Sequence, residues 1–382
     1  MKQSSKEAYN LPEIISQFKI EGEVGSIQSH GSGHIHDTFH IANNQQGSPD
    51  YLLQRINHNI FKNVPLLMDN IHQVTNHLRE KLLAIPGSEP EKEVLTLIPT
   101  HANKWYYHDE AGNYWRMYYF LKDTNTYDIV QTPQQAYEGG KAFGHFQALL
   151  SDLEVNLLHE TIPNFHNIQS RLQLFRAAVQ KNPVNRVKDV QPEIAFIEER
   201  AEAMGAILRL GSSGDLPLRI THNDTKFNNV LLNKENKAQC VIDLDTVMPG
   251  YVAYDFGDAI RTTVNTAAED EKDLEKIAVN MELLESFTQG FLEETKFFLT
   301  KTEIASLAYG VLLLPYIMGL RFLTDYIDGD NYYKIHFPEH NLQRSRAQLQ
   351  LVRKLEEQYP KIEQIILDRS QVKQEVSLAG KI

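Results

Sequence analysis

His222-Asn223-Asp224-Thr225-Lys226-Phe227-Asn228-Asn229 is the stretch of this 382-residue chain that decides its fold. Two short apolar segments come directly after it, 230–232 and 239–242, and Asp243 ends the second one. The polar residues between them, 233–237, favour a turn, so the pattern predicts a β-hairpin. In a hairpin, the start of the first strand lies beside the end of the second. We therefore expect Asn229 and Asp243 to lie together.

The chemistry of three side chains in this stretch indicates phosphoryl transfer. An amide oxygen next to a carboxylate suits Mg²⁺, which prefers oxygen ligands and takes others from water and phosphate. Asp224 lies in a predicted loop just upstream, where its carboxylate can accept the proton of a substrate hydroxyl. A base and two metal ligands are the minimum for moving the γ-phosphoryl group of ATP. A His-x-Asp alone is most often a surface turn, but the full spacing favours a kinase.

Composition and charge agree with a globular enzyme and exclude some partners. The chain is 42% hydrophobic and 23% charged, and its net charge is −12. Such a negative charge argues against nucleic-acid binding, which depends on counterion release by basic residues. Cys240 is the only cysteine and lies in an apolar segment, so the chain can form neither an internal disulfide nor a thiolate metal site.

The N-terminus and the apolar stretches predict no membrane partner. Residues 1–7 lack the apolar core of a signal peptide. The longest uncharged stretch, 304–320, contains Pro315 and is short for a membrane span, so we expect a buried helix there. The expected localisation is cytoplasmic.

The chain divides into two parts with different patterns. Residues 1–118 predict a small β-rich lobe, with helices at 11–18 and 64–83 and strands at 27–29, 38–42, 51–56, 94–99 and 114–119. Residues 119–382 predict a larger, mainly helical lobe, with helices at 133–150, 168–180, 191–210, 270–298, 302–327 and 338–357. The hairpin is its one clear β element. An α+β, protein kinase-like two-lobe fold accounts for this layout, with nucleotide bound between the lobes.

A glycine-rich turn and a basic strand residue in the small lobe fit an ATP site. Gly31-Ser32-Gly33 lies between two strands, where the missing Cβ atoms let the backbone approach phosphates. A lone Gly-x-Gly is more often only a turn. Arg55, at a position where protein kinases use Lys, would face the α- and β-phosphates as a bidentate partner. Taken alone, Arg55 would be an exposed strand residue.

Two further parts of the predicted ATP site are less specific. Asp69 or Glu80 on the next helix would orient Arg55, and the sequence leaves the choice open. Residues 117–121 would be the hinge between the lobes, where Tyr119 and Leu121 meet the adenine.

Five motifs spread along nearly the whole chain resemble those of a known superfamily. They are GSGHIHDTF at 31–39, LQRIN at 53–57, THNDTKFNNV at 221–230, VIDLDTVMPG at 241–250 and RFLTDYIDGDNYYK at 321–334. With them the chain resembles the aminoglycoside phosphotransferase and choline kinase-like superfamily, and within it the N-acetylhexosamine 1-kinases.

The resemblance implies an ATP- and Mg²⁺-dependent kinase that phosphorylates the anomeric C1 hydroxyl of N-acetylglucosamine or N-acetylgalactosamine. It implies Asp224 as the base and Asn229 and Asp243 as the metal ligands. Asp255 and Asp258 are expected to hold the catalytic loop. The resemblance also implies a binding site for this small-molecule sugar built from His34, Asp37, Asp224, Arg321 and Tyr332.

The chain departs from its relatives at several positions. Asn223 stands where many of them carry Gly or Arg, and His36 stands where Asn is expected. His36 therefore leaves the preferred hexosamine open. No Phe-Gly comes after Asp243, and Asp245 could be a second metal ligand or a structural acceptor.

Two other functions stay open at this point. One is a kinase of a cationic small molecule such as choline or an aminoglycoside, against which the positive charge of Arg321 argues. The other is a nucleotide-binding pseudokinase, against which the intact Asp224, Asn229 and Asp243 argue. The oligomeric state and the pathway are not determined by the sequence.

Overall fold

The computed structural model describes residues 9–31 and 35–371. The chain divides into two compact units. Unit 1 comprises Met1–Thr124 and Leu157–Ile162, and unit 2 comprises Asn125–Asn156 and Pro163–Ile382. The division therefore falls six residues after the predicted boundary at 118/119, and one short segment returns to unit 1.

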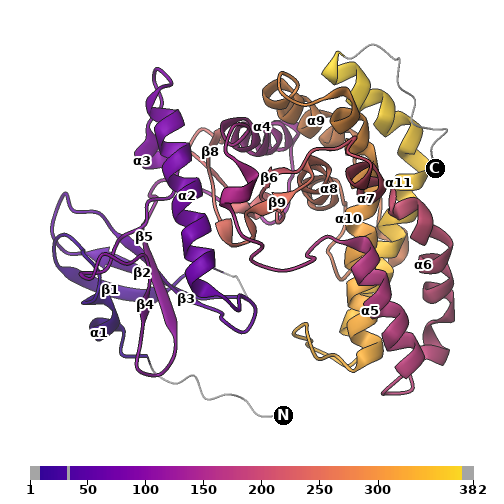
Figure 1. The fold of residues 1–382 in the computed structure, drawn as a ribbon, viewed down its shortest axis with the longest axis horizontal. Helices are drawn as coiled ribbons and strands as arrows, with labels where there is room; N and C mark the ends of the chain where they lie inside the picture. The colour runs from indigo at the N-terminus through magenta and orange to yellow at the C-terminus, as the bar shows by residue number, and fades with distance from the viewer. Residues whose placement is uncertain (1–8, 32–34, 372–382) are drawn as a thin grey trace. The chain divides into compact units, whose positions relative to one another are not determined.

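Unit 1 is built on a five-stranded antiparallel sheet (Figure 1). Across the sheet the strands run in the order β1 (Val24–Ser29), β2 (Asp37–Asn43), β3 (Tyr51–Ile56), β5 (Tyr114–Tyr119) and β4 (Tyr107–His108). The helices of this unit are α1 (Leu11–Ile15), α2 (Val64–Leu83) and α3 (Pro90–Glu93). The strand pair 51–56 and 114–119 and the helix 64–83 were predicted with these bounds.

One face of the sheet is packed against the N-terminal helix. Side chains alternate along a strand, so Leu53 shares its face with Trp115 and Met117 across the pair β3–β5. Ile14 and Phe18, from α1 and the turn after it, pack on this face and are buried. The sheet is therefore held to α1 by an apolar core of its own.

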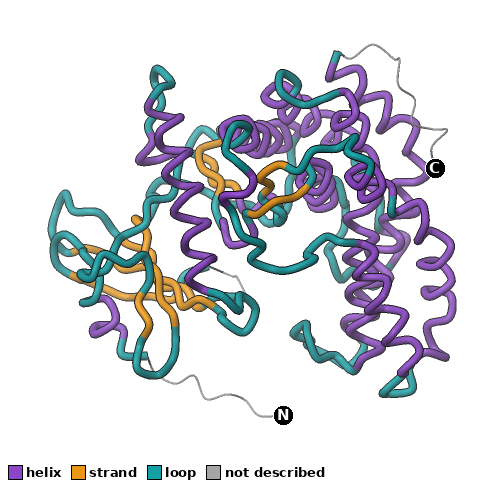
Figure 2. The backbone as a smooth tube through the Cα atoms, in the orientation of Figure 1, coloured by secondary structure: helices purple, strands orange, loops and turns teal. Residues whose placement is uncertain are grey.

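Unit 2 consists mainly of helices (Figure 2). Its helices are α4 (Pro133–Leu149), α5 (Ile168–Lys181), α6 (Gln191–Met204), α7 (Ala206–Ser212), α8 (Val252–Thr263), α9 (Met281–Thr295), α10 (Lys301–Asp328) and α11 (His340–Ser370). Helix α10 packs against α8, α11 and α5, while α4 packs against α9. Gly257 on α8 and Gly310 on α10 allow a backbone contact that a Cβ at either position would obstruct.

The long apolar helix expected at 304–320 lies inside unit 2. Among residues 9–31 and 35–371, α10 is the one helix whose length and composition would also fit a membrane span. However, 78% of its most apolar window is buried within the protein. The packing of α10 is that of a core helix.

Two small sheets complete unit 2. The predicted hairpin is confirmed as β7 (Val230–Leu232) paired with β8 (Ala238–Val241). A second antiparallel pair, β6 (Arg219–Thr221) with β9 (Met248–Gly250), was not predicted. Strands of three residues carry too little alternation for a sequence pattern to identify them.

Several other predicted elements were wrong in extent or type. The segment 94–99 forms only a single bridge, Leu97 to Tyr118, instead of a strand; Pro99 has no N–H to give to a ladder. The predicted helix 191–210 breaks at Gly205, and the predicted helix 270–298 is helical only over α9. Helix α11 continues to Ser370, past Pro360. Helix α8 was missed because buried Asp residues interrupt its apolar pattern.

Candidate active site

A buried carboxylate of unit 2 holds the loop that carries the predicted base. Asp255, in the first turn of α8, accepts hydrogen bonds from the backbone N–H groups of His222 at 2.8 Å and Asn223 at 2.7 Å. The amide of Gln147 donates to the same carboxylate at 2.5 Å, and the Thr225 hydroxyl donates to the Asp255 carbonyl at 2.6 Å. Burial raises the pKa of Asp255 despite these donors. The prediction that Asp255 holds this loop is consistent with these contacts.

His222 links the loop to the hairpin and is not placed to act as a base. Its Nε2 lies 2.9 Å from the Ile242 carbonyl oxygen, and its Nδ1 lies 3.3 Å from the backbone nitrogen of Asp224. Nε2 must donate to the carbonyl and Nδ1 must accept from the N–H, so these partners select the neutral imidazole with the proton on Nε2. Both ring nitrogens are thereby occupied in positioning Asp224.

Asn223 has a structural reason to stand where many relatives carry another residue. Its backbone is in the left-handed region, with φ of 64°. Asn tolerates this conformation better than most residues do. The side-chain amide donates to the carbonyl oxygens of Thr221 at 3.1 Å and Thr246 at 3.0 Å. Asn223 therefore closes the turn against β6 and the segment before β9.

The carboxylate of Asp224 has two polar neighbours from its own loop. The Asn229 amide nitrogen lies 2.8 Å from the Asp224 carbonyl oxygen and 3.4 Å from the carboxylate oxygen Oδ2. The ammonium of Lys226 lies 3.2 Å from the same Oδ2. Asp224 raises the pKa of Lys226, with burial opposing it. Sequence reasoning missed Lys226, although its position two residues after the predicted base was a usable signal.

The hairpin brings the two predicted metal ligands to adjoining backbone positions. Val230 pairs with Val241, and the Ile242 N–H donates to the Asn229 carbonyl at 2.9 Å. Asp243 is the next residue, in a left-handed conformation with φ of 61°. The amide nitrogen of Asn229 donates a hydrogen bond to the Asp224 carbonyl. The amide oxygen of Asn229 therefore faces other partners.

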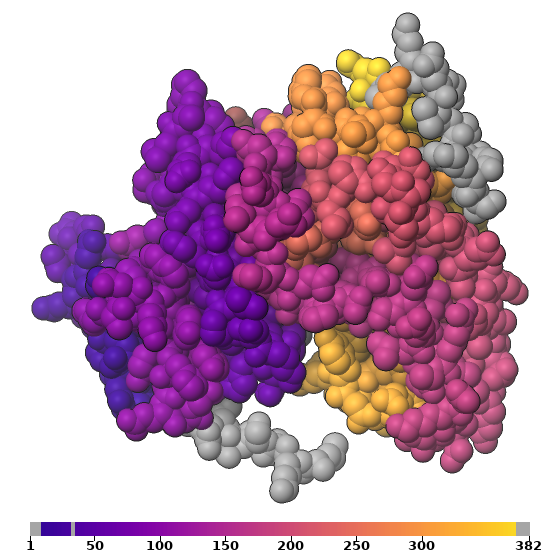
Figure 3. All heavy atoms as spheres, in the orientation of Figure 1, coloured from indigo at the N-terminus to yellow at the C-terminus, as the bar shows by residue number. Residues whose placement is uncertain are grey.

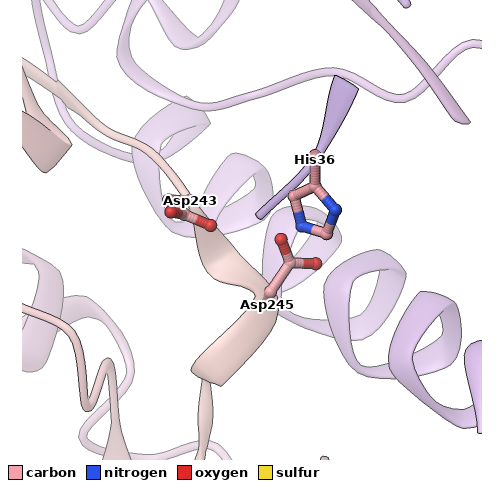
Figure 4. A group of neighbouring side chains, drawn as sticks. All are labelled: His36, Asp243 and Asp245. Carbon is pink, nitrogen blue, oxygen red and sulfur yellow. The ribbon is translucent and has the colours of Figure 1, made fainter. Parts of the chain in front are cut away.

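A second carboxylate lies near Asp243. Figure 4 shows the side chains of Asp243 and Asp245 on the segment after β8, and one oxygen of each lies within 4.8 Å of the other. His36, also drawn there, belongs to unit 1. Asp245 is almost fully buried. Together with the Asn229 amide, these carboxylates form a set of hard oxygen donors that fits Mg²⁺.

A buried histidine bonds to the loop, and a second buried aspartate pairs with an arginine on its own helix. The Nε2 of His166 donates to the Asn223 carbonyl at 2.9 Å, and burial lowers the pKa of His166 to about 4. Arg261 donates to Asp258 at 2.9 Å from Nε. Burial opposes ionisation of Asp258, but Arg261 and His166 hold the pKa of this carboxyl below its ordinary value.

Two of the predicted sugar residues, Arg321 and Tyr332, line a cavity of about 370 Å³ between α5 and α10, and Asp224 is not among its lining residues. The guanidinium of Arg321 lies 5.9 Å from the ring centre of Tyr332 and 5.5 Å from that of Tyr333. Asp325 accepts backbone N–H groups of Tyr332 at 2.8 Å and Tyr333 at 2.9 Å, and so fixes the loop after α10. Arg171 on α5 also lines the cavity, and no local sequence pattern indicated it.

In unit 1, the predicted phosphate ligand and a predicted sugar ligand are bonded to each other. Arg55 and Asp37 lie opposite on β3 and β2, with Arg55 Nε 2.7 Å from the Asp37 carboxylate. The Tyr9 hydroxyl donates to the same carboxylate at 2.8 Å. The expectation that Asp69 or Glu80 orients Arg55 was wrong for the described residues, because Asp37 is the ion-pair partner.

The other predictions in unit 1 concern the glycine turn and the hinge. Gly31 has a positive φ of 78°, as a glycine-requiring turn would have. Ser32, Gly33 and His34 lie outside the described residues. Tyr119 ends β5 and stacks on Tyr51, with ring centres 5.6 Å apart. The carbonyl of Leu121 accepts from the Thr124 hydroxyl at 3.2 Å. Their roles toward ATP stay predictions.

Comparison with known proteins identifies both a family and a fold. The profile described as the phosphotransferase enzyme family matches residues 26–282, which is more than half of the chain. An aminoglycoside phosphotransferase from Alicyclobacillus acidocaldarius has a similar structure, with a TM-score of 0.64 and 11% identity over 96% of this chain and 100% of that one.

Two other solved structures are similar over most of both chains. An amicoumacin kinase in complex with AMP-PNP, Ca²⁺ and Ami has a TM-score of 0.57 and 11% identity, over 89% of this chain and 92% of that one. A choline kinase from Cryptosporidium parvum Iowa II has a TM-score of 0.55 and 16% identity, over 89% and 92%. The predicted kinase-like α+β fold is confirmed. Closeness to the N-acetylhexosamine 1-kinases stays a prediction.

The buried, neutral His166 makes the stability of the protein depend on pH in a defined window. The unfolded chain binds a proton at this residue below about pH 6.5, whereas the folded chain does so only near pH 4. The stabilising contribution is therefore full above about pH 6.5 and is lost as the pH falls toward 4, by about 3 kcal/mol in all.

Urea unfolding at pH 7 and pH 4.5 measures this effect. His166→Gln retains a hydrogen-bond donor for the Asn223 carbonyl but cannot titrate, so its free energy of unfolding should fall less between the two pH values than that of the wild type. His101→Gln, which changes an exposed histidine, should behave as the wild type does. An equal fall in wild type and His166→Gln would contradict the assignment.

Proposed function

The chain belongs to the phosphotransferase enzyme family, and on that premise we propose that it transfers the γ-phosphoryl group of ATP to the anomeric C1 hydroxyl of N-acetylglucosamine or N-acetylgalactosamine. The product is the sugar 1-phosphate. The observation that carries the phosphotransferase part is the catalytic loop, where Asp224, Asn229 and the segment leading to Asp243 are joined by hydrogen bonds. The sugar specificity rests on the motifs at 31–39 and 321–334.

Asp224 serves as the base in the proposed reaction. Its carboxylate accepts the proton of the C1 hydroxyl as that oxygen bonds to the γ-phosphorus and ADP leaves with the electron pair of the broken bond. Lys226 holds the Asp224 carboxylate by charge, and His222 holds the backbone N–H of Asp224. Most of the rate enhancement is therefore positioning and charge stabilisation.

Asn229 and Asp243 would hold Mg²⁺, with Asp245 as a candidate third donor. When bound, the ion supplies positive charge to the phosphate oxygens. Gly31, Ser32, Gly33, Arg55, Tyr119 and Leu121 remain the proposed ATP contacts. Arg55 is ion-paired with Asp37, and Lys226 is ion-paired with Asp224, so each of these cations has a carboxylate partner.

The charges around the cavity of unit 2 favour a neutral acceptor over a cationic one. Arg321 and Arg171 both line it, and each would repel an ammonium group because both carry a positive charge. The similar choline kinase structure shows the fold and leaves the acceptor open. We therefore place choline and aminoglycosides second to N-acetylated sugars.

A panel of acceptors tests the proposed function. With ATP and Mg²⁺, the purified protein should phosphorylate N-acetylglucosamine or N-acetylgalactosamine and leave choline and an aminoglycoside unchanged. The methyl glycosides of the same sugars serve as controls and should be inert, because the attacking oxygen is blocked. Equal turnover of a methyl glycoside would place the reaction at another hydroxyl. ATP binding without turnover of any acceptor would favour the pseudokinase.

The role of the base is tested by Asp224→Asn. The amide keeps the size of the side chain but cannot accept the hydroxyl proton, so turnover should fall by about 10²–10⁴-fold. Circular dichroism and ATP binding should stay as in the wild type. Thr262→Val, on α8 and away from the loop, is a control of similar size. Wild-type turnover by folded Asp224→Asn would remove Asp224 from the mechanism.

A further inference from the structure

The cavity between α5 and α10 has a mixed lining that the catalytic chemistry does not explain. It has a volume of about 370 Å³ and lies entirely within unit 2. Its apolar part comes from both helices, and its charged part includes three basic residues. The lining residues are Arg171, Leu174, Ala177, Ala178, Lys181, Leu320, Arg321, Thr324, Asp325, Asp328, Tyr332 and Tyr333. In Figure 3, α5 and the segment after α10 lie next to each other on the face shown.

Two guanidinium groups of this lining have no carboxylate partner in the described part of the chain. Arg171 donates from Nε and from one terminal nitrogen to the Phe165 carbonyl, at 3.2 and 2.8 Å. Arg321 contacts the Met318 sulfur at 3.7 Å and lies 5.3 Å from the ring centre of Phe165. Burial, and then repulsion by Arg321, lower the pKa of Arg171 to about 10. Both groups thus retain N–H donors that face no acid.

The acids of the cavity do not supply the missing partners. The Asp325 carboxylate is taken by the backbone N–H groups of Asn331, Tyr332 and Tyr333 at 2.8–2.9 Å. Asp328 is the last residue of α10, and Lys181 is the last residue of α5, so one charge of each sign stands at the helix ends.

A buried hydroxyl in the same lining also lacks a partner. The Tyr333 oxygen is shielded from solvent and makes no hydrogen bond in the described structure. A buried polar atom without a partner is uncommon and destabilising, and this one belongs to a residue of the cavity lining. Arg171, Arg321 and Tyr333 thus offer donors, while Leu174, Ala178 and Leu320 offer an apolar wall.

A chain of contacts joins this cavity to the predicted base. Phe165, which binds both arginines, directly precedes His166, and His166 donates to the Asn223 carbonyl. Asn223 directly precedes Asp224. The segment Phe165–His166 thus connects the two arginines of the cavity to the backbone that leads to Asp224.

We propose that the cavity binds the N-acyl group of the acceptor, with Arg171 donating to the acyl oxygen and Leu174, Ala178 and Leu320 packing on the acyl methyl. The proposal rests on the function proposed above and adds Arg171 and Leu174 as specificity residues. Guanidinium donors and an apolar wall match a carbonyl oxygen joined to a methyl group. They reject a free ammonium, which would face two positive charges. A sugar hydroxyl in place of the N-acyl group leaves some of the guanidinium N–H donors without a hydrogen-bond partner.

Arg171→Met tests the polar half of the proposal. Methionine keeps the length of the side chain and removes its donors. The ratio of kcat/KM for N-acetylglucosamine to that for glucose should fall by about tenfold to a hundredfold, with the KM for ATP unchanged. Arg176→Met, which removes an exposed arginine of the same helix paired with Glu198, should keep the wild-type ratio. An unchanged ratio in Arg171→Met would overturn the proposal.

Leu174→Trp tests the apolar half without touching a buried residue. Leu174 is 55% exposed, so the fold should tolerate the larger ring, which fills the cavity. Turnover of N-acetylglucosamine should fall by about tenfold or more while that of glucose changes little. Leu218→Trp, at a leucine that is 50% exposed and outside the cavity, is the matched control. Equal losses for both sugars would contradict acyl binding.

Calorimetric binding of unreactive methyl glycosides separates this proposal from the proposed function. The wild type should bind methyl N-acetylglucosaminide more tightly than methyl glucoside, and Arg171→Met and Leu174→Trp should lose that difference. This readout needs no turnover, so it decides the proposal even if no sugar is phosphorylated. Equal binding of the two methyl glycosides by the wild type would overturn the acyl assignment. A preference for a glucuronide that is lost in Arg171→Met would also overturn it.

Discussion

The carboxylate of Asp255 is the group on which the arrangement of the catalytic loop depends. It is buried and carries a raised pKa, and its oxygens receive two consecutive backbone N–H groups and the amide of Gln147. Burying an ionisable group is unfavourable unless it is hydrogen-bonded, so the native state retains it only with these donors in place. The same carboxylate thereby fixes the backbone one residue before Asp224.

Asp325, another buried aspartate, fixes the loop that lines the cavity by accepting backbone N–H groups in the same way. Asp325, near the end of α10, accepts three backbone N–H groups of the loop that carries Tyr332 and Tyr333, and Asn341 donates to it at 2.8 Å. Helices α8 and α10 are in backbone contact near Gly257 and Gly310. The two loops are therefore held by carboxylates on one closely packed helix pair. This rigid frame relates the proposed base to the proposed acceptor cavity.

Local patterns in the sequence were sufficient to predict the hairpin that follows the catalytic loop. The hairpin β7–β8 is predicted by two apolar segments and a polar turn, and it pairs Asn229 with Ile242, the residue before Asp243. The strand 51–56 and the helix 64–83 were predicted with their bounds because their periods are clear.

Features that depend on distant contacts were not predictable in the same way. Helix α8 is buried on nearly all sides, and to expect Asp255 in such a helix requires knowing that two loop N–H groups bind its carboxylate. The pairing of Arg55 with Asp37 depends on the register of β2 and β3. Arg171 precedes Arg321 by 150 residues, and only the packing of α5 on α10 brings both to one cavity.

Hydrogen–deuterium exchange of the catalytic loop tests the central claim most directly. In the wild type, a peptide covering residues 220–226 should exchange slowly, because the N–H groups of His222 and Asn223 are bound by Asp255. Asp255→Asn presents an NH₂ group where one oxygen stood, so this peptide should exchange roughly tenfold faster or more. Peptides from α4 and α9 should stay unchanged. If residues 220–226 kept wild-type protection in folded Asp255→Asn, the carboxylate would not be what holds the loop.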